Sequence, residues 1–177
     1  MITLVLGGAR SGKSELAERL AAASARDNGC GVTYLATMQV GDDAALAERV
    51  SRHRERRPAD WATVETGAHR DLPDALESAS GTVLLDSLGP WLALHLDSSS
   101  GSFSTDTAAL CAALARRAGD MIVVSDEVGL GVIPATAAGG AFRDALGSLN
   151  QAVAAVADRV LLVVAGRVLT LDAAPER

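Results

Sequence analysis

A glycine-rich segment with one lysine follows the first apolar run of the chain and constrains its fold more than any other feature. Residues 7–14 read Gly-Gly-Ala-Arg-Ser-Gly-Lys-Ser and satisfy the pattern G-x-x-x-x-G-K-[ST]. The apolar run at 2–6 precedes the segment, and the helix formers Glu15 and Leu16 follow it. A strand, this loop and a helix in succession form the phosphate-binding loop (P-loop) of nucleotide-binding α/β proteins. We therefore expect a nucleoside triphosphate to bind here.

Short apolar runs alternate with longer alanine-rich stretches along the rest of the chain. The expected strands are residues 2–6, 31–36, 82–86, 121–125, 160–164 and 168–171. The first five are continuously apolar, as the strands of a parallel sheet covered on both faces are. A Gly166-Arg167 turn between the last two predicts a hairpin, and so an antiparallel edge strand. The pattern predicts a P-loop α/β fold: a mostly parallel sheet with helices on both faces.

The stretches between the expected strands have helical apolar spacing. Leu16 and Leu20 are four residues apart, as are Leu110 and Leu114. The longest stripe has the spacing 4-3-4-3 and consists of Phe142, Leu146, Leu149, Val153 and Val156. We expect one domain over residues 1–177, with a polar surface loop at 97–104 and a helical insertion at about 41–65.

Composition and charge exclude several classes of protein. The chain of 177 residues has a formal net charge of −6, which argues against general nucleic-acid binding. No aliphatic run approaches the roughly 20 residues of a membrane span, and the start of the chain lacks the basic region of an export signal. Two cysteines are too few for a disulfide framework or a zinc site. We expect a soluble, cytoplasmic protein.

The P-loop residues have separate expected roles in binding a nucleotide. Gly7 and Gly12 allow backbone amides to turn inward and to form an anion-binding nest at the start of a helix. Lys13 supplies a positive charge to the β and γ phosphates, and the Ser14 hydroxyl is a ligand for Mg²⁺. The remaining residues expected to contact the nucleotide in this loop are Gly8, Ala9, Arg10 and Ser11.

Carboxylates at the ends of two other strands are candidate partners of the metal. Asp86 ends the apolar run 82–86, and we expect it to hold Mg²⁺; the alternative is a residue that caps the next turn. Asp126 and Glu127 follow the run 121–125, and the carboxyl ends of parallel strands meet at one edge of the sheet. Glu127 is a candidate metal group or base for an incoming hydroxyl, with a capping or surface role as the alternative.

A histidine in an arginine-rich segment is the candidate nucleophile. Residues 42–57 predict a helix on which His53 shares a face with Leu46 and Val50. Four arginines surround it, at positions 52, 54, 56 and 57. A cationic cluster lowers the pKa of a histidine and favours neutral imidazole, which can attack phosphorus. The alternative is a packed histidine beside a solvated arginine face. His69 and His95 have no such context, and we treat both as structural.

Further segments occur in a fixed order along the chain. After the P-loop come Tyr-Leu-Ala-Thr at 34–37, His-Arg-x-x-Arg-Pro at 53–58 with Trp61 and Glu65, and Glu-Val-Gly-Leu-Gly-Val-Ile-Pro at 127–134. Phe-Arg-Asp-x-Leu-Gly-x-x-Asn-Gln follows at 142–151, then Ala-Asp-Arg-Val-Leu-Leu-Val-Val-Ala-Gly at 157–166. With these segments, nearly the whole chain resembles the bifunctional adenosylcobinamide kinase / adenosylcobinamide-phosphate guanylyltransferase family of cobalamin biosynthesis.

The resemblance implies two reactions on a corrinoid substrate. One phosphorylates the hydroxyl of adenosylcobinamide with ATP or GTP. The other transfers GMP from GTP to that phosphate through a covalent guanylyl-histidine, here His53, and releases pyrophosphate. It also implies a fold of the RecA type and a homotrimer. The nucleotide contacts that it implies are the P-loop, Thr37, Arg54, Glu55, Arg56, Arg57, Glu65 and Asp86, with Glu65 as a reader of guanine.

The chain differs from the pattern of the family at a few positions. Asp126 stands where the pattern has Asn, and this adds a charge near the expected phosphate site. Ser-Leu-Gly-Pro at 87–90 also differs in detail, and Arg52 replaces a second histidine found in some members.

Two other functions are alternatives to the bifunctional one: a simple P-loop small-molecule kinase without a covalent intermediate, and a non-enzymatic nucleotide-binding regulator.

Overall fold

A single seven-stranded sheet forms the centre of the molecule, in the strand order β3-β2-β4-β5-β1-β6-β7. The computed structural model describes residues 1–38, 48, 51, 54, 57–66, 71–97 and 103–173. The strands are β1 (Ile2–Gly7), β2 (Val32–Ala36), β3 (Ala62–Glu65), β4 (Thr82–Asp86), β5 (Met121–Asp126), β6 (Arg159–Val164) and β7 (Arg167–Leu171). All neighbouring pairs are parallel except β6 and β7, which are antiparallel. The expected mostly parallel sheet with an antiparallel edge strand is confirmed.

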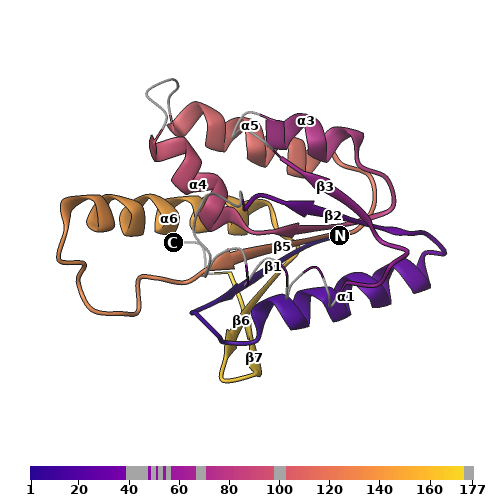
Figure 1. Cartoon of the computed structure of the whole chain (residues 1–177), viewed down its shortest axis with the longest axis horizontal. Coiled ribbons are helices and arrows are strands. Elements are labelled where there is room, and N and C mark those ends of the chain that lie inside the picture. Colours follow the sequence, from indigo (N-terminus) through magenta and orange to yellow (C-terminus); the bar gives the residue numbers. More distant parts are fainter. Residues whose placement is uncertain are drawn as a thin grey trace.

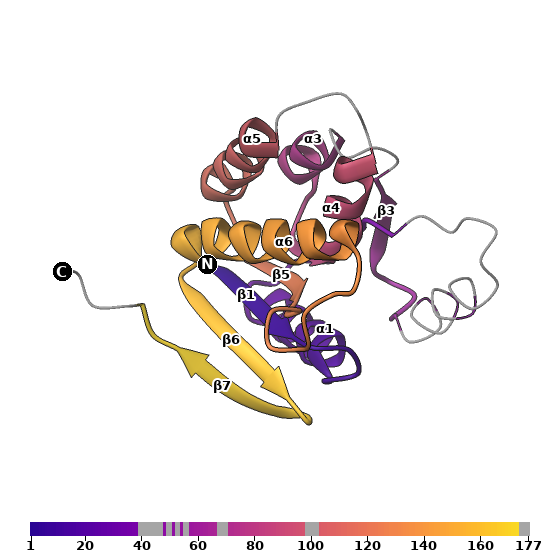
Figure 2. The same cartoon turned by 90° about the vertical axis from the view of Figure 1, so that its left-hand side faces the viewer.

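Helices cover both faces of this sheet. They are α1 (Lys13–Asp27), α3 (Asp71–Ser78), α4 (Leu88–Asp97), α5 (Phe103–Arg116) and α6 (Ala137–Val156). Figure 1 shows α1 on one face and α3, α4, α5 and α6 on the other, and Figure 2 gives the view at right angles. The core is divided in the same way, because one apolar cluster lies between the sheet and the four-helix layer and the other lies under α1.

The apolar stripes predict the buried faces of the helices well in two of three cases. Leu110 and Leu114 of α5 are fully buried, and the stripe of α6 packs on the core through Leu146, Leu149 and Val153. In α1 the stripe marks the inward side only in part. Leu16 and Leu20 are half-buried and pack against the core, and the buried residues are Lys13, Ala17, Ala21 and Ala25. Because alanine side chains are short, α1 lies close against the sheet.

The segment 41–65 is only partly described, and it contains a strand that the sequence did not reveal. The expected helix at 42–57 lies mostly outside the described residues, although Glu48, Ser51 and Arg54 are helical. Residues 62–65 are β3, the edge strand beside β2, so the helical insertion does not extend to residue 65. Within the expected polar loop 97–104, Phe103 and Ser104 belong to α5, and residues 98–102 lie outside the described part of the chain.

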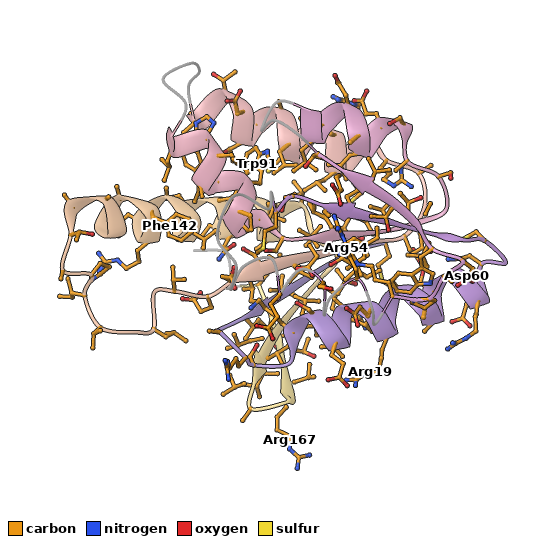
Figure 3. All side chains as sticks on the ribbon, in the orientation of Figure 1. Arg19, Arg54, Asp60, Trp91, Phe142 and Arg167 are labelled. Carbon is orange, nitrogen blue, oxygen red and sulfur yellow. The ribbon has the colours of Figure 1, made fainter. Side chains whose placement is uncertain are left out.

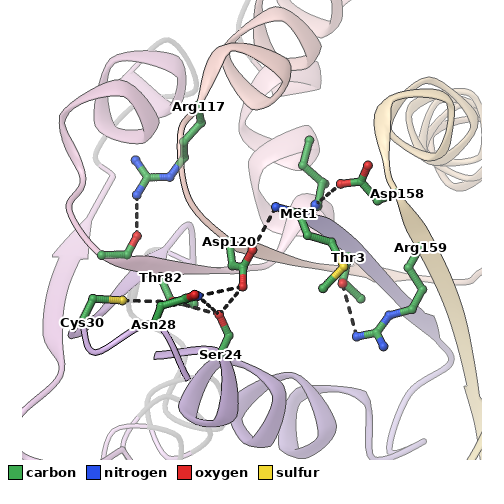
Figure 4. Close-up of polar contacts among 12 residues, drawn as sticks. Met1, Thr3, Ser24, Asn28, Cys30, Thr82, Arg117, Asp120, Asp158 and Arg159 are labelled. Carbon is green, nitrogen blue, oxygen red and sulfur yellow. Dashed lines mark hydrogen bonds and ion pairs between the residues drawn. The ribbon is translucent and has the colours of Figure 1, made fainter. Parts of the chain in front are cut away.

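Polar contacts fasten the amino-terminal edge of the sheet, at the opposite end from the P-loop (Figure 4). Asp120, just before β5, accepts hydrogen bonds from Ser24 Oγ at 2.7 Å and from Asn28 Nδ2 at 3.0 Å. The Met1 amino group lies 2.9 Å from its other oxygen. These bonds lower the pKa of Asp120, the largest contribution being that of Ser24. The network ties α1 to the start of β5.

Among the described helices, none is long and apolar enough to span a membrane.

Candidate active site

A cavity of about 150 Å³ opens at the carboxyl ends of the parallel strands. Parallel strands direct their carboxyl ends to one edge of the sheet, where α/β proteins bind their ligands. The residues that line the cavity are Ala9, Lys13, Ser14, Tyr34, Ala36, Met38, Arg54, Arg57, Glu65, Asp86, Ser87 and Asp126. Seven of these were expected to contact the nucleotide, and Asp126 was expected near its phosphates. The other four are Tyr34, Ala36, Met38 and Ser87.

The P-loop connects β1 to α1 in a conformation that requires glycine at two positions. A Cβ on Gly7 would lie 2.8 Å from the carbonyl oxygen of Val163, so a side chain does not fit there. Gly12 has a φ of 96° and begins α1 with no side-chain cap on the helix. The first amides of a helix need partners, and a phosphate at this end supplies them. Gly8, Ala9, Arg10 and Ser11 form the intervening turn, which the Ser11 amide closes on the Gly8 carbonyl at 3.3 Å.

Lys13 forms an ion pair with Asp126 at the carboxyl end of β5. Its Nζ atom lies 2.7 Å from Asp126 Oδ1 and 3.2 Å from the carbonyl oxygen of Gly8. Lys13 is 6% exposed, so its charge is largely shielded from water. The peptide of Asp126 is held in turn, because its carbonyl accepts from Asn150 Nδ2 at 3.1 Å and the Asn150 oxygen accepts from Ser125 Oγ at 2.6 Å.

Glu127 lies outside this cavity. Its carboxylate accepts a hydrogen bond from the Gly129 amide at 2.6 Å, and its side chain lines a neighbouring groove of about 610 Å³ between α6 and the β6–β7 hairpin. The second carboxylate that the structure brings beside Lys13 and Asp86 is therefore Asp126.

Asp86, at the end of β4, is held by a tyrosine of the adjacent strand. The Tyr34 hydroxyl donates to Asp86 Oδ2 at 2.6 Å. Burial is the main cause that raises the pKa of Tyr34 far above its usual value, and the nearby Asp86 carboxylate raises it further, so the hydroxyl stays protonated. The guanidinium carbon of Arg57 lies 3.5 Å from the centre of the tyrosine ring. One side chain thus contacts both the carboxylate and the arginine.

Arg54 and Glu65 form an ion pair at the edge-strand end of the cavity. Both side chains are more than half exposed, at 53% and 57%. Arg54 is labelled in Figure 3, which shows the side chains on the ribbon. Glu65 is the last residue of β3, so the missed strand is what carries the expected guanine reader to the cavity.

Thr37 does not line the cavity. Its side chain is fully buried, and its hydroxyl donates to the carbonyl of Ser87 and accepts from the Ser87 amide at 3.0 Å. Thr37 therefore fastens the end of β2 to the end of β4, directly beside Asp86. His53, Glu55 and Arg56 lie outside the described residues.

The arrangement suits a long anion that lies across the strand ends. From β1, which leads to Lys13, to β3, which carries Glu65, there are four strand spacings, or roughly 19 Å. Cationic side chains stand at both ends: Lys13 at one, Arg54 and Arg57 at the other. The cavity also offers a hydroxyl from Ser14 and a carboxylate from Asp86. These hard oxygen donors suit Mg²⁺, which is usually bound by one or two protein ligands together with phosphates.

Comparison with known proteins decides the family. The family model described as cobinamide kinase / cobinamide phosphate guanyltransferase matches residues 3–171. The chain belongs to this family. The bifunctional adenosylcobalamin biosynthesis protein CobP of Pseudomonas aeruginosa is 41% identical, over 99% of both chains. The bifunctional adenosylcobalamin biosynthesis protein CobU of Escherichia coli is 36% identical, over 94% of this chain and 97% of its own.

A solved structure supports the fold of this cobinamide kinase / cobinamide phosphate guanyltransferase member. The flagellar accessory protein FlaH from Methanocaldococcus jannaschii aligns with a TM-score of 0.53 over 94% of this chain and 74% of its own. The two sequences are 14% identical, so the likeness concerns the fold alone.

Proposed function

We propose that this chain phosphorylates cobinamide, as adenosylcobinamide, and then transfers GMP from GTP to the resulting phosphate. The observation that carries the proposal is a single cavity with the P-loop lysine at one end and two arginines with Glu65 at the other. A triphosphate with its attached nucleoside would extend from this cavity along the carboxyl ends of the strands. The identity of the substrate comes from the family and from its relatives.

For the kinase reaction, the P-loop amides and Lys13 would hold the β and γ phosphates of ATP or GTP. The oxygen of the cobinamide hydroxyl would attack the γ phosphorus while the bond from that phosphorus to the β–γ bridging oxygen breaks. The nucleoside diphosphate would then depart, and the hydroxyl proton would pass to water. Ser14 and Asp86 would hold Mg²⁺, which neutralises charge on the phosphate oxygens when bound. Lys13 would contribute a positive charge that is already in position, in a site shielded from water. Negative charge develops on the phosphate oxygens there during the reaction.

For the guanylyl transfer, His53 would attack the α phosphorus of GTP, and pyrophosphate would leave as the phosphorus–nitrogen bond forms. An oxygen of the cobinamide phosphate then attacks the same phosphorus, and that bond breaks to give adenosylcobinamide-GDP. Arg54, Arg56 and Arg57 would stabilise the charge on the α phosphate, with Glu55 beside them. Glu65 would accept hydrogen bonds from the guanine base. Arg54, which adjoins His53 in sequence, lines the cavity and supports this placement.

A labelling experiment tests the proposal. The protein is incubated with α-labelled GTP and denatured, and the label that stays on the protein is measured for the wild type and for His53→Asn. We expect acid-labile, base-stable label on the wild type, none on His53→Asn, and full label on the matched control His69→Asn. Corrinoid-dependent phosphorylation should persist in His53→Asn. Wild-type labelling of a folded His53→Asn protein would contradict the covalent step, and phosphorylation without any label would select the simple kinase.

We also propose that the enzyme is a cytoplasmic homotrimer, as the resemblance implies. An apolar segment between β5 and α6 supports self-association: Leu130, Val132 and Ile133 are 80%, 93% and 83% exposed. Large exposed apolar patches mark interaction sites in soluble proteins. Light scattering after size-exclusion chromatography tests the assembly, and a mass of about one chain at micromolar concentration would contradict it.

A further inference from the structure

Tyr34 lines the cavity, and neither proposed reaction step uses it. It is the one tyrosine of the chain, it is 1% exposed, and it lies on β2 between the strands that carry Glu65 and Asp86. Its hydroxyl donates to Asp86 Oδ2 at 2.6 Å. Its ring lies against the Arg57 guanidinium, with 3.5 Å between the guanidinium carbon and the ring centre.

We propose that Tyr34 is a positioning residue that orients the Asp86 carboxylate through its hydroxyl and holds Arg57 through its ring. Tyr34 would thereby fix the distance between the metal side of the cavity and its arginine side. This inference rests on the proposed function, because it assumes that Asp86 acts on nucleotide-bound Mg²⁺.

The hydroxyl can orient the carboxylate because the bond is short and charge-assisted. A carboxylate on a single Cβ can rotate, and the bond from the Tyr34 hydroxyl to Oδ2 restricts that rotation. Outer hydrogen-bond partners of metal ligands typically change metal affinity by roughly 10–100-fold when removed. A tyrosine that only satisfied its own buried hydroxyl would affect stability and leave metal affinity unchanged.

The ring can hold Arg57 because a guanidinium over an aromatic face is attracted by the π electrons. The tyrosine ring is rigid and has few rotatable bonds, so its two contacts move together. Thr37 adds to this arrangement by fastening the neighbouring end of β2 to Ser87, the residue after Asp86. The position of Arg57 relative to Asp86 is thus set by one strand and one side chain.

The first test measures the Mg²⁺ dependence of nucleotide binding, without turnover. Calorimetry with a non-hydrolysable GTP analogue at increasing Mg²⁺ compares the wild type with Tyr34→Phe. We expect the half-saturating Mg²⁺ concentration to rise roughly tenfold in Tyr34→Phe, with analogue affinity in the absence of Mg²⁺ unchanged within about twofold. The matched control is Thr33→Val, on the same strand as Tyr34. It removes a buried hydroxyl that donates a hydrogen bond to the Ser80 carbonyl at 2.8 Å. The control should keep the wild-type curve.

A double-mutant cycle shows whether Tyr34 acts through Asp86. In an Asp86→Asn background, Tyr34→Phe should have no further effect on the Mg²⁺ dependence, because the group that it orients is already altered. An equal effect in both backgrounds would overturn the inference, as would an unchanged Mg²⁺ curve for Tyr34→Phe.

The ring is tested with Tyr34→Leu, which removes both contacts, against Tyr34→Phe, which keeps the ring. Analogue affinity without Mg²⁺ should fall several-fold in Tyr34→Leu, by about as much as in Arg57→Leu. Because Tyr34 is the one tyrosine, ¹³C labelling of its ζ carbon also gives a single resonance. That resonance should move in Asp86→Asn and in Arg57→Leu, and stay in place in Thr33→Val. A resonance unmoved by either substitution would overturn the inference even where Tyr34→Leu fails to fold.

The same data separate failure of this inference from failure of the proposed function. A wild-type protein that binds no GTP analogue, with or without Mg²⁺, would overturn both. A wild-type protein with Mg²⁺-dependent binding, together with a Tyr34→Phe protein indistinguishable from it, would overturn the inference alone.

Discussion

The Lys13 ammonium lies 2.7 Å from a carboxylate oxygen of Asp126 in the loop where we expect a triphosphate to bind. The P-loop lysine therefore already has an anionic partner. Because Lys13 is 6% exposed, a nucleotide has to replace Asp126 as that partner rather than pair with a free cation. We therefore expect Asp126 to compete with the nucleotide for Lys13 and to lower the nucleotide affinity.

Asp126→Asn is expected to tighten nucleotide binding and to destabilise the protein without ligand. The substitution removes the competing charge, and it leaves a buried lysine without its ion pair. We expect a several-fold lower dissociation constant for a non-hydrolysable GTP analogue by calorimetry, together with a lower melting temperature. Weaker binding in a folded Asp126→Asn protein would show that Asp126 helps to bind the nucleotide.

Lys13→Ala is expected to impair both reactions, because each develops charge on phosphates at the same loop. Loss of one positioned charge in a shielded site typically lowers the rate by roughly 100–1,000-fold. Kinetics of corrinoid phosphorylation and of guanylyl transfer measure the two effects. Arg19→Ala is the matched control, because it removes a cation of α1 that is 62% exposed and pairs with Glu15. Full turnover in Lys13→Ala would contradict the assignment of the P-loop.

Asp86→Asn is expected to shift the Mg²⁺ requirement of the kinase reaction to higher concentration. Asp86 lines the cavity with Ser14, and an amide is a weaker ligand for a hard cation than a carboxylate is. Initial rates over a Mg²⁺ titration measure the shift, with Asp60→Asn on an exposed turn as the control. If the two variants and the wild type give one curve, the metal does not depend on Asp86.

Asp120→Asn is expected to lower the free energy of unfolding near neutral pH by roughly 1–2 kcal/mol. Hydrogen bonds in the folded state lower the pKa of Asp120 below its unfolded value of 3.8. Its contribution is therefore complete above pH 3.8 and is lost as the pH falls through the folded-state pKa. Urea unfolding at pH 7, 5 and 3 should show a difference from the wild type that shrinks at the lowest pH. Asp144→Asn, with a side chain 71% exposed, serves as the control.

Gly81→Ala is expected to destabilise the protein more than Gly29→Ala. The two glycines have similar φ values, 66° and 62°, so both substitutions carry the left-handed strain of roughly 1–2 kcal/mol. A Cβ on Gly81 would also overlap the carbonyl of Gly31, whereas one on Gly29 meets nothing within 4 Å. Overpacking adds roughly 1–3 kcal/mol for Gly81→Ala alone. Equal unfolding free energies for the two variants would contradict this account.

The central strands were predictable because burial on both faces leaves a plain signal in the sequence. Residues 82–86 form β4 with the expected bounds, and the strands expected at 2–6 and 121–125 extend one residue further. β3 was missed because all four of its residues are exposed, so they show no apolar run. Its position depends on hydrogen bonds with β2, a partner that local sequence does not reveal.

The residues of the candidate site were likewise predictable only in part. The P-loop carries its chemistry in consecutive residues, so Lys13 and Ser14 could be assigned from the pattern alone. The pairing of Lys13 with Asp126 depends on β5 lying beside β1, which no local pattern encodes. The sequence predicted no individual role for Tyr34, because a tyrosine within a strand usually indicates packing. Its contacts with Asp86 and Arg57 arise only from the order of the strands.

The strand order also bears on how the chain acquires its structure during synthesis. In the described sheet, β1 pairs with β5 and β6, and not with β2, β3 or β4, which lie between β1 and β5 in the chain. The backbone N–H and C=O groups of β1 therefore lack their strand partners until residues beyond 121 have been synthesised. Contacts between such distant segments form slowly. A nascent chain that stops before β5 is thus expected to depend on chaperones, and it is unable to complete the lysine–aspartate pair of its own P-loop.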